Sequence, residues 1–223
     1  MRLFIFLSLI IVATYKQDFI LDSISNLNQS SGTLTEQTEK AIEYADSLQE
    51  AIAEFEDSRE GIDKDIEAST KGTLSDLELI ESSSLRSSVK NWAEKWDGVK
   101  HRFDELKDSF DEVKNSSENY FSKLNEIADH INNPELKESE KVKNSSLQNS
   151  WNSVLKESAT NIDSLNSLIL EGDDFHRVLL GTSIREKLGD SIGELKEISV
   201  KAEKLLSELK KLTLEGKKLR AEI

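Results

Sequence analysis

Cysteine is absent from the 223-residue chain, and proline occurs once. The lack of cysteine excludes disulfides, thiolate metal sites, cysteine nucleophiles and a lipid-modified cysteine within this sequence, and it leaves the redox compartment open. Proline is excluded from helix interiors, so a single proline favours long helices with few turns. Aromatic residues make up 6% of the chain and charged residues 32%, a balance that also favours long, solvated helices over a large compact core.

Positive charge is scarce, because 29 Lys and Arg residues face 43 Asp and Glu residues and leave a net charge of −14. Nonspecific binding to nucleic acid or to an anionic membrane needs clustered Lys and Arg, so neither is expected as the main role. Residues 17–84 contain 17 acids and 4 bases, whereas residues 195–223 contain 5 acids and 8 bases. An acidic first helix and a basic last helix could flank each other, or both could be solvated faces.

An apolar run opens the chain, where Arg2 precedes the uncharged residues 3–13. Eleven helical residues cover about 16 Å, which is roughly half of the ~30 Å hydrocarbon core of a bilayer. This pattern predicts a signal peptide over residues 1–14, with cleavage near Ala13 or Thr14. A short uncleaved membrane anchor and a buried helix start are the alternatives. We expect export to the periplasm or cell envelope.

Heptad spacing is the strongest pattern in the chain and predicts long helices that pack on one another. In residues 85–131, fourteen positions alternate between four- and three-residue steps, and thirteen of them are apolar or aromatic. These positions are Leu85, Val89, Trp92, Trp96, Val99, Phe103, Leu106, Phe110, Val113, Ser117, Tyr120, Leu124, Ile127 and Ile131. We call such a row of positions a seam. A weaker seam with the same steps runs from Ile20 to Ile66.

Turn-forming residues divide the chain into four predicted helices, over about 18–70, 85–131, 136–171 and 183–223. The residues that mark the helix ends are Gly72 with Ser82, Ser83 and Ser84, then Asn132, Asn133 and Pro134, and then Gly172, Asp173 and Asp174.

Short connections between such helices favour antiparallel neighbours. The sequence therefore predicts an all-α fold over residues 17–223, a single elongated antiparallel bundle or coiled coil of three to four long helices. The oligomeric state is open, because a seam satisfied within one chain has the same pattern as one satisfied between chains.

One catalytic pattern occurs, the G-x-S-x-G of residues 189–193. In serine hydrolases this elbow follows a strand and is followed along the chain by an acid and a histidine. The sequence has no histidine after Ser191, and the pattern lies within the last predicted helix. We therefore expect Ser191 to pack and not to react.

The three histidines offer no complete metal site. Glu126 with His130, and Asp173 with His176, have helical spacing, but each pair supplies two ligands where a closed site needs about four. We expect solvated ion pairs there. No catalytic, cofactor-binding or metal-ligating residue and no cofactor are predicted, and the chain is predicted not to be an enzyme.

The three tryptophans, Trp92, Trp96 and Trp151, lie on the seams, so core packing is expected and not an aromatic ligand box or a membrane belt. Polar residues also occupy seam positions, where they either fix the register of the helices or line a small-molecule pocket. They are Ser31, Thr38, Arg59, Ser117 and Ser158.

Residues 16–24, KQDFILDSI, resemble the start of an uncharacterised bacterial family, domain of unknown function 2959. The segment 131–136, INNPEL, is similar to that family's turn between two long helices, and residues 179–192 share the apolar spacing of its C-terminal segment. The chain lacks the lipobox cysteine that some members carry. The resemblance implies an exported helical protein and supplies no activity.

We therefore predict a non-enzymatic, exported coiled-coil protein with a structural or scaffolding role in the cell envelope. It would act through protein partners or self-association, without nucleic acid, and would touch a membrane only through an uncleaved N-terminal segment. A helical ligand-binding or sensor bundle is one alternative. A membrane-surface bundle held by the basic residues of 195–223 is the other.

Overall fold

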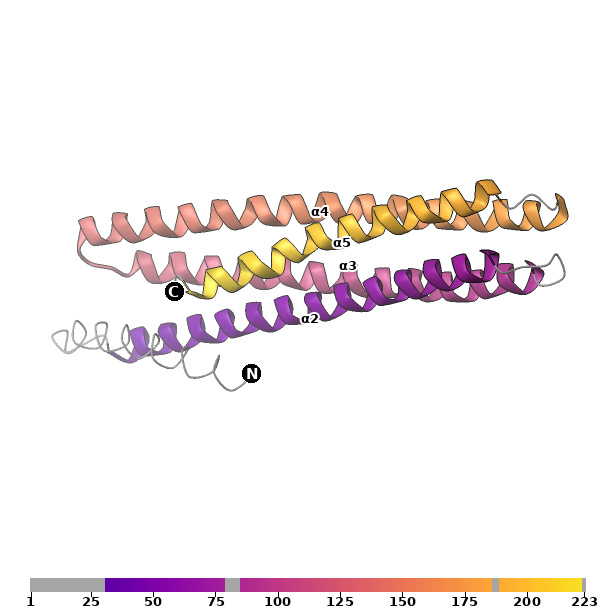
Figure 1. The fold of residues 1–223 in the computed structure, drawn as a ribbon. Helices are drawn as coiled ribbons and strands as arrows, with labels where there is room; N and C mark the ends of the chain where they lie inside the picture. Colours follow the sequence, from indigo (N-terminus) through magenta and orange to yellow (C-terminus); the bar gives the residue numbers. More distant parts are fainter. Residues whose placement is uncertain (1–30, 79–84, 186–188, 222–223) are drawn as a thin grey trace. The chain divides into compact units, whose positions relative to one another are not determined.

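The computed structural model describes residues 31–78, 85–185 and 189–221, and the elements in these ranges are four α-helices. They are α2 (Ser31–Glu78), α3 (Leu85–Asp129), α4 (Pro134–Arg185) and α5 (Gly189–Ala221), as drawn in Figure 1. The predicted all-α class is confirmed. No helix in the described part of the chain combines the length and apolar character needed to span a membrane. The predicted signal peptide lies outside the described residues.

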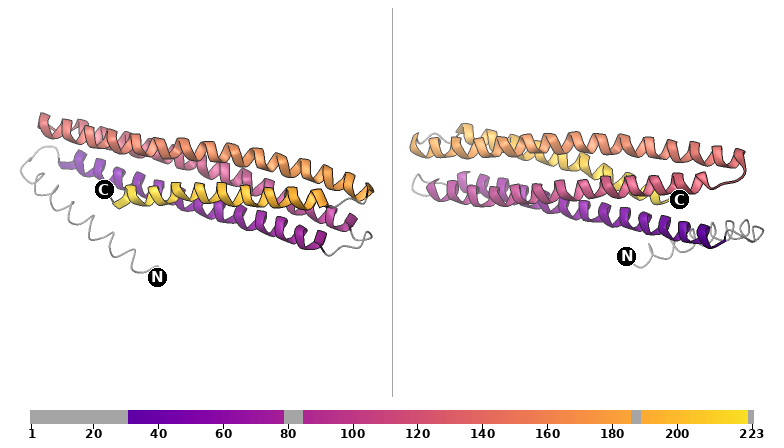
Figure 2. Two further views of the ribbon diagram at one scale, coloured as in Figure 1. Left: turned by 45° about the horizontal axis from the view of Figure 1, so that its top comes forward. Right: turned by 180° about the vertical axis from the view of Figure 1, so that it is seen from behind.

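The chain divides into two compact units, residues 1–43 and residues 44–223, and the second unit is described here. Within it, successive helices run in opposite directions, as Figures 1 and 2 show for α3, α4 and α5. The indole N–H of Trp96 donates to the carbonyl of Ile169 (3.2 Å) and thereby joins α3 to α4. The ammonium of Lys201 contacts Glu171 (2.8 Å) and joins α5 to α4.

The helices α2 and α5 are also neighbours, which closes the bundle. The Gln49 amide donates to the carbonyl of Gly216 (3.3 Å), and the Thr213 hydroxyl donates to Glu56 (2.7 Å). A Cβ at Gly216 would lie 2.5 Å from the Cδ1 atom of Ile52, so the two helices approach closely there. The first and last helices therefore flank each other.

The seam of α3 forms the centre of the core. From Val89 to Tyr120 every seam position is buried, whereas Leu124, Ile127 and Ile131 are half-buried. Figures 1 and 2 show the reason, since α5 ends before it reaches the turn between α3 and α4. The last two turns of α3 therefore have fewer neighbours than its middle.

The turn between α3 and α4 forms where the single proline predicts it. The Asn133 side-chain oxygen accepts hydrogen bonds from the backbone N–H groups of Glu135 (3.0 Å) and Leu136 (3.1 Å). Asn133 is thus the N-cap, and Pro134 occupies the first helical position, where its missing N–H removes no hydrogen bond. The predicted helix end and chain reversal are confirmed.

The predicted break at Gly172 is wrong, because α4 continues through it to Arg185. A Cβ at Gly172 would lie 2.0 Å from the Trp96 ring, so the bare backbone makes room for the indole. Glycine inside a helix costs about 1 kcal/mol relative to alanine. Truncation of a buried tryptophan costs roughly 3–5 kcal/mol, so packing outweighs propensity here.

An aromatic cluster surrounds that glycine. The Trp92 and Trp96 rings are stacked with centroids 4.6 Å apart, and Phe175 meets Trp92 edge-on at 5.0 Å. The Trp92 indole N–H also donates to the Gly172 carbonyl (3.4 Å). Both indoles are buried, and both are satisfied by backbone carbonyls of α4.

Two further boundaries differ from the sequence prediction. The helix α2 continues past residue 70 to Glu78, because Thr70, Thr73 and Leu77 are buried against the bundle. The last helix begins at Gly189 and not at residue 183, since α4 occupies residues up to Arg185. The predicted helix over 18–30 lies outside the described residues.

We expect Gly172→Ala to lower the free energy of unfolding by about 2–3 kcal/mol, because the new methyl group overlaps a ring that is itself packed on both sides. Gly98→Ala is the matched control in α3. A Cβ at Gly98 would meet nothing within 4 Å, so this change should stabilise the protein by up to about 1 kcal/mol. Urea denaturation measures both. Equal effects of the two substitutions would show that the aromatic contact does not limit helix approach.

Candidate functional site

The three tryptophans lie in the core, as predicted, with exposed fractions of 1% or less. Two of them form the aromatic cluster. The third, Trp151, is buried on α4, and neither its indole N–H nor the Tyr120 hydroxyl of α3 has a hydrogen-bond partner among the described residues. Burial raises the pKa of Tyr120, so the hydroxyl stays neutral. These groups are components of the core.

Arg59, a polar seam residue, is buried in an ion pair and does not line a pocket. Its guanidinium makes two contacts with Glu56, from Nε (2.8 Å) and from Nη2 (3.0 Å), and Nη1 donates to the Leu206 carbonyl (3.5 Å). Thr213 of α5 completes the cluster by donating to Glu56 (2.7 Å). The cluster fixes the position of α5 beside α2.

Opposing effects act on the pKa of Glu56. Burial by itself would raise it, but hydrogen bonds from Arg59 and Thr213, together with the positive charges of Arg59 and Lys210, bring it below the ordinary value. The same contact with Glu56 raises the pKa of Arg59, although burial opposes this. Both groups are therefore charged at neutral pH, and the pair is internally satisfied.

The other polar seam residues do not assemble into a pocket either. The Ser117 hydroxyl donates to the Lys114 carbonyl within α3, and Ser158 is buried on α4. Thr38 is half-buried in α2, and nothing is described of the Ser31 side chain. The described hollows include none of the five positions.

The histidines and the G-x-S-x-G pattern likewise do not assemble into a site within the described ranges. The His130 ring contacts the backbone carbonyl of Glu126 (2.7 Å), and the Glu126 carboxylate contacts Lys123 (2.9 Å). Asp173 contacts Lys100 of α3 (3.3 Å). Ser191 is buried in the first turn of α5 and is not exposed on a strand-to-helix elbow. Within the described ranges, no group of three or more His, Cys, Asp or Glu side chains could hold a metal ion.

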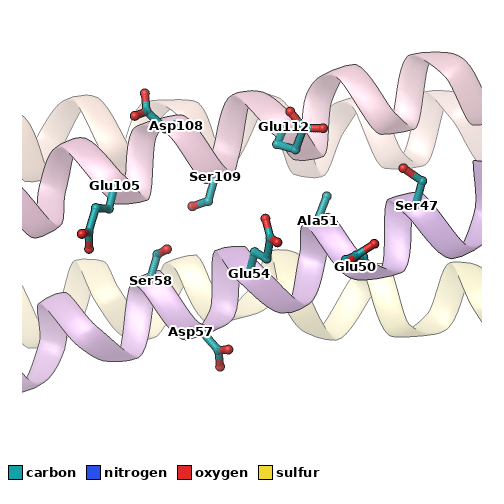
Figure 3. A pocket seen from close by; sticks show the side chains of 10 residues that line it. All are labelled: Ser47, Glu50, Ala51, Glu54, Asp57, Ser58, Glu105, Asp108, Ser109 and Glu112. Carbon is teal, nitrogen blue, oxygen red and sulfur yellow. The ribbon is translucent and has the colours of Figure 1, made fainter.

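A groove of about 680 Å³ lies between α2 and α3 (Figure 3). Its floor contains two small, buried side chains, Ala51 and Ser109. Six carboxylates line it, three from each helix. They are Glu50, Glu54 and Asp57 of α2 and Glu105, Asp108 and Glu112 of α3.

The six carboxylates differ in direction and in pairing. In Figure 3, Glu54 of α2 and Glu105 of α3 point toward the opposite helix, whereas Asp57 and Asp108 lie at the outer margins. Only Glu105 has an ion-pair partner among the described residues, Arg102 at 2.8 Å and His101 at 3.5 Å. Coiled-coil flanks normally pair opposite charges, so like charges on both sides of one interface destabilise it.

The groove is not predicted from the sequence, although the sequence contains a pattern for it. The carboxylates of α2 follow a four-three spacing beside the first seam, and those of α3 follow a three-four spacing beside the second. The spacing alone does not show that the two rows meet, because that depends on the register between α2 and α3.

The basic residues of α5 contact α4 in the described structure. Lys201 contacts Glu171 and Lys211 contacts Glu157, at 2.8 Å and 2.6 Å. The groove carboxylates lie between α2 and α3 and are not neutralised by these lysines.

A second hollow, of about 600 Å³, lies at the start of α4 and is lined by that helix alone. Its apolar members are Pro134 and Val142, and Val142 and the nearby Leu136 are both 59% exposed. It has no wall from a second helix, so it is a shallow surface.

No family model, no curated protein and no solved structure matches the chain. The resemblance to domain of unknown function 2959 stays a prediction.

The Glu56 cluster predicts a specific pH dependence. Because the carboxyl has a lower pKa in the folded than in the unfolded protein, its charge stabilises the fold above the unfolded pKa, and this contribution is lost as the pH falls through the folded value. We expect Glu56→Gln to cost about 2 kcal/mol near pH 7 and less at pH values below about 4. Urea denaturation as a function of pH tests this. Glu118→Gln, at an exposed position of α3, is the control, and parallel pH curves for wild type and Glu56→Gln would refute the assignment.

The groove predicts that neutralising one of its carboxylates stabilises the fold. Glu54→Gln should raise the free energy of unfolding by about 0.5 kcal/mol at low salt, and the gain should shrink in high salt as repulsion is screened. Glu94→Gln is the contrasting variant, because Glu94 contacts Lys90 (3.5 Å) and its loss should bring no gain. If Glu54→Gln were destabilising at every salt concentration, the carboxylates would not be repelling one another.

Proposed function

We propose that this protein is a non-enzymatic scaffold that acts through protein–protein contacts, and that the groove between α2 and α3 receives a cationic helix. The observation that carries the proposal is the set of six carboxylates, three from each helix, that line the groove. Such an arrangement costs folding stability, and surfaces kept at a cost to stability are characteristic of function.

The dimensions of the groove favour a helix as the occupant. Its walls span residues 47–58 of α2 and 105–112 of α3. At 1.5 Å per residue these walls are about 16 Å and 10 Å long, which matches two to three helical turns. Because the floor is made of the small Ala51 and Ser109, long side chains of a docked helix can enter between the walls.

The chemistry of the walls favours Lys or Arg on that helix. A cation between the rows would relieve the repulsion between carboxylates of α2 and α3 and would add attraction to both. Exposed ion pairs contribute little one at a time, so binding would rest on several such contacts and would weaken with salt.

The N-terminal pattern of Arg2 followed by the apolar residues 3–13 supports a location outside the cytoplasm. The resemblance of residues 16–24 to an exported bacterial family supports the same location. The scaffold would then work in the cell envelope.

The experiment is a binding titration with a fluorescent helical peptide that carries lysines at seven-residue spacing. We expect binding near 0.1 M salt and its loss near 1 M salt. Glu54→Gln combined with Glu112→Gln should weaken binding about tenfold, if each lost contact contributes up to about 1 kcal/mol.

The matched control is Glu94→Gln combined with Glu118→Gln, which removes the same charge from α3 outside the groove. This control should bind the peptide as the wild type does. Equal weakening by both double variants would indicate a general effect of net charge, and absence of peptide binding at low salt would overturn the proposal.

A further inference from the structure

The outward side of α5 carries a second heptad-spaced stripe, opposite the one that faces the core. Six positions alternate between four- and three-residue steps, and all six are exposed. This outer stripe consists of Val200, Lys204, Ser207, Lys211, Leu214 and Lys218.

The outer stripe combines cationic and apolar side chains. Lys204, Lys211 and Lys218 repeat every seven residues, and their side chains are 76%, 52% and 66% exposed. Val200 is 66% exposed and Leu214 is 50% exposed. No described helix of the same unit covers this side of α5, since its buried positions face α2 and α4.

The spacing of the lysines matches the spacing of the groove carboxylates. Glu105 and Glu112 on the α3 wall are seven residues apart. Seven residues cover about 10.5 Å of helix, so two successive lysines of the stripe can meet successive carboxylates of the groove. Leu214 lies between Lys211 and Lys218, at the place where a docked helix would face the small side chains of the floor.

We propose that the outer stripe of α5 docks into the α2–α3 groove of a second copy of this chain. The inference rests on the proposed function of the groove and names its occupant. Charge complementarity selects the second copy, because the same molecule carries an acidic groove and a basic stripe with one common repeat.

The present contacts of the lysines do not prevent this docking. Lys211 contacts Glu157 of α4, Lys218 contacts Glu215, and Lys204 lies 3.8 Å from Glu208. These pairs are exposed to solvent and are therefore weak and readily exchanged. The groove offers several carboxylates at once.

The contact joins two different surfaces, so it is heterologous. Each copy that donates its α5 stripe keeps its own groove open for a third copy, and association continues until a ring closes or the assembly stays open-ended. The mass of the assembly should therefore rise with protein concentration.

Sedimentation velocity of the full-length chain tests the proposal. We expect species larger than a monomer at about 0.1 M salt, where the Debye length is ~10 Å, and a monomer at about 1 M, where it is ~3 Å. The stripe variant, Lys211→Gln with Lys218→Gln, and the groove variant, Glu54→Lys with Glu112→Lys, should each be monomeric at both salt concentrations.

Mixing the two variants gives the decisive measurement. The stripe variant keeps its acidic groove and the groove variant keeps its basic stripe, so one contact can form between them and no further growth is possible. We expect a species of twice the monomer mass in the mixture at low salt. Lys90→Gln with Lys143→Gln, the control with the same change in net charge, should assemble as the wild type does. Circular dichroism checks that each variant is folded.

The outcomes separate this inference from the proposed function. A wild type that stays monomeric at low salt, or a mixture that forms no dimer, overturns self-docking. If the cationic peptide still binds the groove in that case, the groove function stands and its occupant is another protein. Loss of both peptide binding and assembly would overturn both proposals.

Discussion

The close approach of Trp96 to the backbone at Gly172 is the contact on which the arrangement of α3 and α4 depends. A heptad seam tolerates displacement by whole repeats, since apolar residues meet apolar residues in several registers. The indole fits only where no side chain lies opposite it, because a Cβ at Gly172 would overlap the ring at 2.0 Å. Its N–H must also reach a carbonyl, which Ile169 provides. These requirements select one register for the pair.

A buried ion pair selects the register between α2 and α5 in the same way. The ion pair of Arg59 with Glu56 is buried, and burying charge costs desolvation that the pair itself only partly repays. Its effect is therefore on specificity, because a shifted α5 would withdraw Thr213 from Glu56 and leave the charges with fewer partners. Gly216 acts together with it by allowing α5 to approach Ile52. Each of these two helix–helix contacts thus combines a glycine with a satisfied polar group.

The sequence predicts the helices well and their contacts poorly, for a physical reason. The seam of α3 and the cap at Asn133 and Pro134 are local patterns, and the structure confirms both. Gly172 is a local signal too, but its effect on the helix depends on Trp96, 76 positions earlier in the chain. Helix propensity alone therefore predicts a break that does not occur. The groove likewise depends on residues that are distant in the sequence. Its two rows of carboxylates are visible in the sequence, but only the register brings Glu54 and Glu105 to opposite walls.

The distribution of charge then follows from the packing. The lysines of α5 contact Glu171 and Glu157 of α4, so the basic helix neutralises part of α4 and not the α2–α3 interface. At one end of the groove that interface pairs opposite charges, since Arg102 contacts Asp65 of α2 at 3.3 Å and Glu105 of α3 at 2.8 Å. Six carboxylates therefore gather where two long helices meet over a floor of small side chains. A surface of this kind gains from a cation more than either helix would alone, because one bound charge relieves repulsion on both walls at once.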